Sequence, residues 1–286
     1  MIKGSLQNSG FYNKVMQLFA VLVLAIVVIT LLTTLLTDSD LNNIMSVKRM
    51  QLIQSLVLFV GSPLLLSFLW SETPLIYLQL KTTNKPSVYL LVAFTMIAAI
   101  PFINLLTELN RQISLPEVLA PIENWMRATE IQLEEVTLKM VNVHTISDLI
   151  FNLFLIAVLA GLGEELFFRG ILQKMFGEWR NAVLAIWLAA FVFSAIHLQF
   201  YGFFPRMLLG AFFGYLLFWS GNLWLPILAH TVNNGLAVLY YYLKFNGMQV
   251  PELDTIGTGN TLYLSAISFV VTLFCILKIR KTLVSR

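Results

Sequence analysis

Long apolar runs separated by short polar segments fill most of the chain. A helix that crosses a membrane needs about 20 mainly apolar residues to span roughly 30 Å of hydrocarbon. Eight runs come near that length, at residues 14–37, 51–70, 88–108, 146–176, 182–200, 205–220, 223–243 and 261–280. The pattern therefore predicts an all-α integral membrane protein, built as a bundle of about eight transmembrane helices.

A long connection, residues 109–145, interrupts this series. Its apolar residues recur at helical spacing, whereas charged residues such as Glu123, Arg127 and Glu130 fill the other faces. This pattern is typical of an amphipathic helix that lies on a membrane surface, here over residues 116–145. Two interpretations stay open, because the helix can be an ordinary surface connector or a gate over a site.

The runs divide the chain into four parts. Residues 1–115 are expected to form an N-terminal scaffold of three transmembrane helices, followed by the amphipathic connecting helix. Residues 146–243 carry every polar motif described below. Residues 244–286 are expected to hold a loop and the last transmembrane helix.

The composition agrees with a membrane protein. Hydrophobic residues make up 58% of the chain and charged residues only 12%, about half of the roughly 25% that is usual in soluble domains. The net charge of +3 is small, and the basic residues fall at the ends of apolar runs, which argues against a nucleic-acid partner. Cys275 is the only cysteine, so the chain can form no internal disulfide.

An even number of spans leaves both termini on one side of the membrane. Lysine and arginine are moderately more frequent on that side, and this bias favours cytoplasmic termini. The first apolar run, 18–37, is too long for the core of a signal peptide, so we expect it to be retained as a span. We therefore expect a multi-pass protein of the cell (plasma) membrane, with the lipid bilayer as a partner.

The segment GEELFFRG (163–170) puts charged residues where the surrounding sequence is most apolar. A charged group at membrane depth costs from about 3 to more than 10 kcal/mol. Glu165 and Arg169 are four residues apart and can neutralise each other along one helix face. Glu164 points about 100° away from Glu165 and has no local cation. An unpaired carboxylate of this kind suits a general acid or base that works near neutral pH.

Two of the three histidines fall in later apolar runs, His197 in FSAIH and His230 in HTVNN. Counting about 1.5 Å per residue from the nearest turns puts both at a depth similar to that of Glu164. Asn234 shares a face with His230, because it follows one turn later, whereas Asn233 points off that face and is expected to be structural. Polar groups from three helices at one depth indicate a functional site inside the bundle. For Asn234 alone, interhelical hydrogen bonding remains an alternative.

The three motifs have the forms EExxxR (164–169), FxxxH (193–197) and HxxxN (230–234), in that order on successive apolar runs. Together they resemble the CPBP family of intramembrane proteases. This family includes the type II CAAX prenyl endopeptidases and the bacterial abortive-infection and bacteriocin-immunity proteins. The resemblance covers roughly residues 146–243, which would then be the catalytic core.

The resemblance implies a role for each motif residue. Glu164 would activate a water molecule, assisted by His197. His230 and Asn234 would stabilise the oxyanion of the tetrahedral intermediate. Supporting roles in organising and packing the site would fall to Glu165, Arg169 and Phe193.

The resemblance also implies an endopeptidase, classed as a metalloprotease, that hydrolyses a peptide bond in a membrane-embedded or lipid-anchored protein. A prenylated CAAX-type protein is one such substrate. Whether a metal takes part stays open. Glu164, His197 and His230 could hold Zn²⁺ with one position free, whereas hydrolysis by a carboxylate and an imidazole needs no metal.

Two other functions remain as alternatives. One is a proton- or ion-coupled transporter, in which membrane carboxylates and histidines form a relay. The other is a non-catalytic bacteriocin-immunity or scaffold protein that keeps the motifs for packing.

Overall fold

A computed structural model describes residues 2–37, 43–81 and 83–285 of the chain, and all regular structure in these residues is helical. The N-terminal third contains α1 (Phe11–Leu36), α2 (Ile44–Gln54), α3 (Ser62–Trp70), the single turn α4 (Pro74–Tyr77), α5 (Pro86–Ala98) and α6 (Ile100–Arg111). The connecting helix α7 (Ala120–Val141) follows. The rest of the chain forms α8 (Ile146–Asn152), α9 (Ala160–Glu165), α10 (Lys174–Trp179), α11 (Ala182–Ala195), α12 (Phe203–Ser220), α13 (Trp224–Phe245) and α14 (Leu262–Val284).

Some of these elements are parts of one continuous helix. The π-helical segment Ser55–Gly61 joins α2 to α3. Two more, Leu153–Leu159 and Leu166–Gln173, join α8, α9 and α10 into a helix over Ile146–Trp179. The short α9, which carries both glutamates of the first motif, therefore lies between two π-helical segments, a feature that is frequent at functional sites.

Five helices in the described residues are long and apolar enough to cross a membrane, and the pair α5 and α6, bent by 43°, would make a sixth. The chain is thus a multi-pass membrane protein, but the expected count of about eight spans is not confirmed. Helix α11 has only 14 residues. Helix α13 has 22 residues, but its polar motif HTVNN lowers its mean hydropathy, and it is not among the candidate spans.

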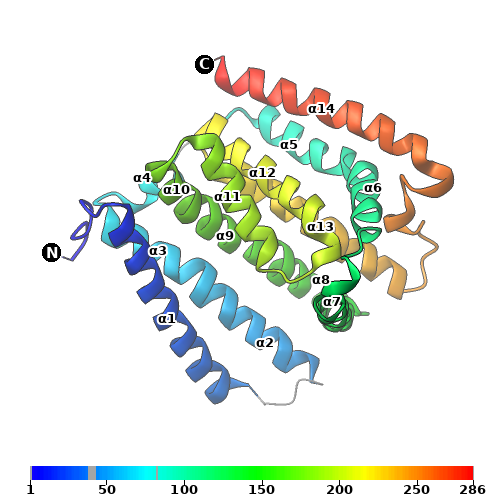
Figure 1. Cartoon of the computed structure of the whole chain (residues 1–286), viewed down its shortest axis with the longest axis horizontal. Helices are drawn as coiled ribbons and strands as arrows, with labels where there is room; N and C mark the ends of the chain where they lie inside the picture. Colours follow the sequence, from blue (N-terminus) through cyan, green and yellow to red (C-terminus); the bar gives the residue numbers. More distant parts are fainter. Residues whose placement is uncertain (1, 38–42, 82, 286) are drawn as a thin grey trace.

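The helices form one bundle with the motif-bearing helices near its middle (Figure 1). Helices α1 and α3 pack on one flank, where α3 contacts the π-helical segment Leu166–Gln173. Helices α5, α6 and α14 pack on the other flank, where α5 contacts α13 and α6 contacts α12. Large apolar side chains that are fully buried, Leu66, Phe168, Ile171 and Leu223, fill the core on the α3 side.

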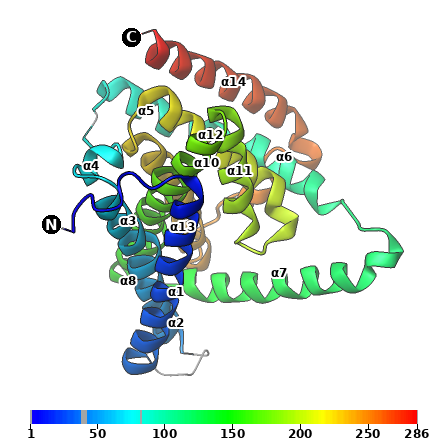
Figure 2. The ribbon, with the colours of Figure 1, turned by 60° about the vertical axis from the view of Figure 1, so that its left-hand side comes forward.

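Helix α7 runs crosswise to the bundle, and an extended loop connects it to the end of α6 (Figure 2). It contacts α2, α13 and the short 3₁₀ turn Phe200–Gly202. Apolar side chains such as Ile122, Trp125 and Ile131 are exposed on it, as expected for an amphipathic helix at a membrane surface. Glu130 binds the bundle instead, because its Oε2 accepts a hydrogen bond from the backbone N–H of Tyr201 at 2.9 Å.

Candidate active site

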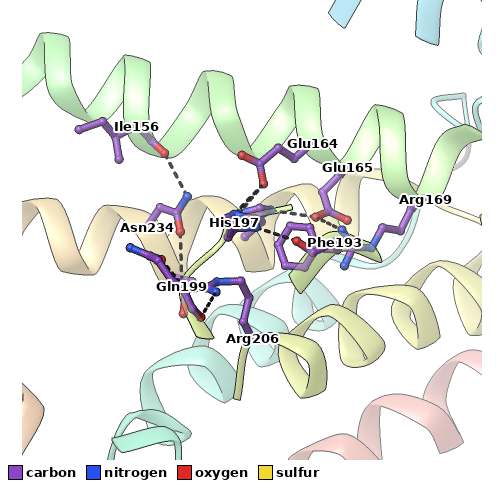
Figure 3. A network of polar contacts seen from close by, with 11 residues as sticks. Ile156, Glu164, Glu165, Arg169, Phe193, His197, Gln199, Arg206 and Asn234 are labelled. Atoms are coloured by element: carbon purple, nitrogen blue, oxygen red, sulfur yellow. Dashed lines mark hydrogen bonds and ion pairs between the residues drawn. The ribbon is translucent and has the colours of Figure 1, made fainter. Parts of the chain in front are cut away.

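The motif residues meet at a cavity of about 550 Å³ among α6, α7, α9, α12 and α13. Five of the seven predicted site residues line it, namely Glu164, Phe193, His197, His230 and Asn234. The other two, Glu165 and Arg169, lie behind this wall and are completely buried. The structure therefore brings all seven predicted residues to one place. Figure 3 labels each of them except His230.

Glu164 faces both histidines. Its Oε2 lies 3.8 Å from Nε2 of His230 and 3.9 Å from Nε2 of His197. These distances are too long for direct hydrogen bonds, but they are within the reach of a single bridging water. The same oxygen is buried and has no hydrogen-bond partner among the described residues, so it is free to bind such a water.

The other edge of each imidazole is fixed. Nδ1 of His197 lies 2.7 Å from the backbone oxygen of Phe193, which can only accept, so Nδ1 carries the hydrogen. Nδ1 of His230 lies 2.8 Å from Oε1 of Glu165 and donates to that carboxylate. In neutral form, both rings therefore present the lone pair of Nε2 toward Glu164.

Glu165 and Arg169 form the predicted ion pair, with Nη1 of Arg169 2.8 Å from Oε1 of Glu165. Arg169 also donates from Nη2 to the backbone oxygen of Gly210 at 2.9 Å, and its guanidinium lies 4.6 Å from the centre of the Phe193 ring. A buried charge is tolerated only when it is paired and hydrogen-bonded. The ion pair and the hydrogen bonds to Gly210 and His230 meet most of this requirement, although Oε2 of Glu165 and Nε of Arg169 have no partner among the described residues. Through Glu165, the pair also orients His230.

Two glycines allow the helices around the site to approach closely. A Cβ at Gly161 would lie 2.8 Å from Oγ1 and 3.2 Å from the backbone nitrogen of Thr231 on α13. A Cβ at Gly210 would lie 3.2 Å from Nη2 of Arg169. Gly161 therefore lets α9 and α13 approach closely, and Gly210 lets α12 approach the guanidinium of Arg169.

Asn234 faces the site as expected, whereas the prediction that Asn233 points off this face is wrong. Nδ2 of Asn234 donates to the backbone oxygen of Ile156 at 3.0 Å, which ties α13 to the π-helical segment Leu153–Leu159. Asn233 does not point away from the site, since it lines the cavity and donates from Nδ2 to Oδ1 of Asn234 at 3.1 Å. The amide of Asn234 keeps a second N–H.

The position of His197 in an apolar run suggested that it lies inside a span, but the structure places it outside the helix. Helix α11 ends at Ala195, and His197 lies in the turn that follows. Leu198, the next residue, has a φ of 54°, which is uncommon for a residue other than glycine, asparagine or aspartate. This turn directs both His197 and Gln199 into the cavity, whereas the side chain of Leu198 is exposed.

Two residues of the site, Gln199 and Arg206, were not predicted. Both line the cavity, and Arg206 donates to the side-chain Oε1 of Gln199 at 2.5 Å and to its backbone oxygen at 3.3 Å. In the sequence, Arg206 is one of the basic residues that fall at the ends of apolar runs, here the run 205–220. Its position directly after Pro205, at the start of a helix that follows FSAIH, was the available signal.

The site residues do not fit a metal ion as they stand. Among the side chains that the structure describes, there is no group of three or more His, Cys, Asp or Glu arranged to hold one. Ligand atoms at 2.0–2.2 Å from a tetrahedral zinc ion are roughly 3.4 Å apart. The separations of 3.8 and 3.9 Å between Glu164 and the two imidazoles are wider than this.

Comparison with known families agrees with the motifs. Residues 146–236 match the family model "Type II CAAX prenyl endopeptidase Rce1-like". No curated protein and no solved structure matches the chain significantly. The family match confirms the resemblance to the CPBP family over the segment that carries all three motifs, and it indicates a CAAX-type intramembrane protease.

Proposed function

We propose that this protein is an intramembrane endopeptidase that hydrolyses a peptide bond of a membrane-associated protein with a water activated by Glu164 and His197. One observation carries the proposal. The unpartnered Oε2 of Glu164 lies within one water's reach of two imidazole nitrogens on the wall of a large cavity. A carboxylate and an imidazole around a water form a general-base arrangement.

The proposed reaction starts when Glu164 takes a proton from the bound water, while Nε2 of His197 accepts the water's other hydrogen in a hydrogen bond. The oxygen attacks the carbonyl carbon, and an oxyanion forms. Collapse of this intermediate breaks the C–N bond, and protonated Glu164 returns its proton to the leaving amine. No other reactant is required.

His230 and Asn234 are the proposed donors to the oxyanion. Asn234 can supply its second amide hydrogen. His230 can donate from Nε2 only when it is protonated, and the carboxylate of Glu165, 2.8 Å from Nδ1, would stabilise the imidazolium. Donors aimed at developing negative charge contribute about 10²–10³ in rate each in other hydrolases.

A lipid-anchored substrate, including a prenylated CAAX-type protein, is the proposed substrate class. An apolar pocket of about 110 Å³ between α5, α6, α12 and α14 adjoins the cavity and shares Ile103, Pro205 and Leu209 with it. A hydrocarbon chain in this pocket would hold its peptide next to Glu164. The division of the chain into scaffold, connecting helix, catalytic core and last helix remains part of this proposal.

The proposed topology keeps eight helices at membrane depth, with α11 as a short span and α13 as the span that carries the polar motif. Both termini would be cytoplasmic, in the plasma membrane. The alternating direction of successive helices in Figure 1 supports a common side for the two ends of the chain.

The test is incubation of the purified full-length protein with farnesylated CAAX peptides in detergent or nanodiscs, followed by mass spectrometry of the products. We expect cleavage by the wild type and none by a folded Glu164→Gln variant. A parallel reaction with chelator measures any need for a metal. Equal cleavage by wild type and variant would contradict the assignment, and cation-driven uptake without cleavage would favour a transporter.

A further inference from the structure

Arg206 differs from the other arginines near the site because it is half-buried and yet pairs with no carboxylate. It lies half-buried in the first turn of α12, on the cavity wall. Arg169 binds Glu165 and Arg127 binds Glu123. Within the described part of the chain, the ion pairs do not include Arg206.

The partners of Arg206 leave most of its donors free. A guanidinium has five N–H groups, and the hydrogen bonds of Arg206 go to two oxygens of one neutral residue, Gln199. Glu130 and Glu164 attract this cation through space, but neither binds it directly. A half-buried charge without a directly bound counter-ion is costly unless something compensates for it. The planar fork of arginine suits a carboxylate, which it can bind with two parallel hydrogen bonds.

The carboxylates of the same cavity are used elsewhere or point from other walls. Glu130 accepts a hydrogen bond from the backbone of Tyr201, and Glu134 is exposed on α7. Glu164 faces the two imidazoles. The free donors of Arg206 are therefore available to a ligand.

Gln199 holds the guanidinium of Arg206 near His197, one of the proposed catalytic residues. It lies two residues after His197, across the turn that the positive φ of Leu198 creates. Figure 3 shows Gln199 and Arg206 together near His197, on the side away from Glu164. Gly202 leaves room for the guanidinium, since a Cβ there would lie 3.3 Å from Nη2 of Arg206.

We propose that Arg206, held by Gln199, binds a carboxylate of the peptide substrate and so sets where the chain is cut relative to that carboxylate. The proposal rests on the proposed endopeptidase function, which it deepens. The carboxylate can come from the C-terminus of the substrate or from an aspartate or glutamate side chain. Either source would present a carboxylate to Arg206, and the experiment below distinguishes the two.

The test measures binding and cleavage separately. Four farnesylated peptides of otherwise equal sequence are compared: one with a free C-terminal carboxylate, one with a C-terminal amide, and two amidated peptides with aspartate or asparagine near the end. Dissociation constants are measured in the non-cleaving Glu164→Gln background, with and without Arg206→Gln. Values of kcat/KM are measured with wild-type Glu164.

We expect one carboxylate peptide to bind about 10-fold or more tightly than its amide counterpart, because hydrogen bonds to charged groups contribute about 1.5–3 kcal/mol. Arg206→Gln should remove this preference, and Arg206→Lys should keep only part of it. Arg111→Gln is the matched control, since Arg111 is an exposed arginine at the rim of the same cavity. It should leave the preference unchanged.

The ratio between two peptides does not depend on the fraction of folded protein, so a destabilised variant still gives an answer. Equal binding of carboxylate and amide peptides by the Glu164→Gln protein would overturn the role of Arg206, whether or not cleavage occurs. So would a preference that survives Arg206→Gln. A preference that depends on Arg206, without cleavage by the wild type, would instead support the binding site and contradict the endopeptidase.

Discussion

Two adjacent glutamates of α9 lie in opposite surroundings. The closed cluster consists of Glu165, Arg169 and the Nδ1 edge of His230, joined by contacts of 2.8 Å. The open cluster consists of Glu164, His197 and the Nε2 edge of His230, separated by 3.8 and 3.9 Å. Glu165 is fully buried, whereas the side chain of Glu164 keeps 15% of its surface at the cavity.

The difference indicates that two adjacent residues have different roles, a structural one for Glu165 and a chemical one for Glu164. In the closed cluster, the charges are paired at hydrogen-bond distance. Oε2 of Glu165 and Nε of Arg169 have no partner of their own among the described residues, but both side chains are enclosed and neither lines the cavity. In the open cluster, the separations of 3.8 and 3.9 Å are too long for direct hydrogen bonds, and a water to one side of each pair of atoms can bridge them. His230 belongs to both, with one nitrogen held by the closed cluster and the other presented to the open one. The buried ion pair therefore orients the ring that the cavity uses.

The largest expected effect is on activity, at the open cluster. Glu164→Gln keeps the shape of the side chain but removes the base, and general-base catalysis contributes about 10²–10⁴ in rate. We expect kcat for peptide cleavage to fall by at least about 100-fold while the thermal midpoint in detergent stays within a few degrees of the wild type. A loss of activity accompanied by unfolding would mean that Glu164 is structural, which would erase the contrast with Glu165.

The second effect is on stability, at the closed cluster. Arg169→Met leaves the carboxylate of Glu165 buried with only His230 as partner, and breaking one side of a buried pair costs about 3–5 kcal/mol. We expect poor yield and a much lower thermal midpoint. The double variant Arg169→Met with Glu165→Leu should recover part of this loss without recovering activity. A stable Arg169→Met protein with normal cleavage would show that the ion pair neither holds the fold nor orients His230.

The sequence predicts the ion pair of the closed cluster well, because its two members are close in the chain. Glu165 and Arg169 are one turn apart, and local helix geometry alone brings them together. The ranges of the apolar runs also correspond to helices, as for 14–37 and the observed Phe11–Leu36. The span count is less predictable, since the polar side chains of the site lower the hydropathy of α13 itself.

The open cluster is harder to predict, because it depends on a turn. The apolar residues Leu198 and Phe200 continue the hydrophobic pattern beyond Ala195, so the run 182–200 gives no sign that the helix ends there. The turn at Leu198 needs a positive φ, which glycine usually signals. For the same reason, periodicity alone could not find the contact between Gln199 and Arg206.

A third, smaller effect tests the spacing between the clusters. Gly161→Ala would press its Cβ against Thr231 and push α9 away from α13, at an expected cost of about 1–3 kcal/mol in stability. The wider gap between Glu164 and His230 should also lower kcat. Gly235→Ala is the matched control on α13, because its Cβ would meet neighbours only at 3.7 Å. Similar behaviour of both variants would show that close helix contact does not set the site's geometry.

The smallest effect concerns a third glutamate, in a pair with the same spacing as the buried one. Glu123 and Arg127 also lie four residues apart, but on the surface of α7, with a contact of 2.6 Å. The hydrogen bond from Arg127, and next the one from the backbone N–H of Leu115, lower the pKa of Glu123 from its ordinary value of 4.5. Its contribution to stability is therefore present above that ordinary value and is lost as the pH falls through the lowered one.

Removing the surface pair of Glu123 and Arg127 should lower the stability of the protein only slightly, and only at pH values at which Glu123 is ionised. The expected result for Glu123→Gln is a slightly lower thermal midpoint than the wild type at neutral pH, a difference that disappears as the pH falls through the lowered pKa of Glu123. Added salt should also shrink it, because exposed pairs are screened. A difference that persists at low pH would mean that Glu123 acts through packing. A difference as large as that of Arg169→Met would show that burial does not distinguish the two pairs.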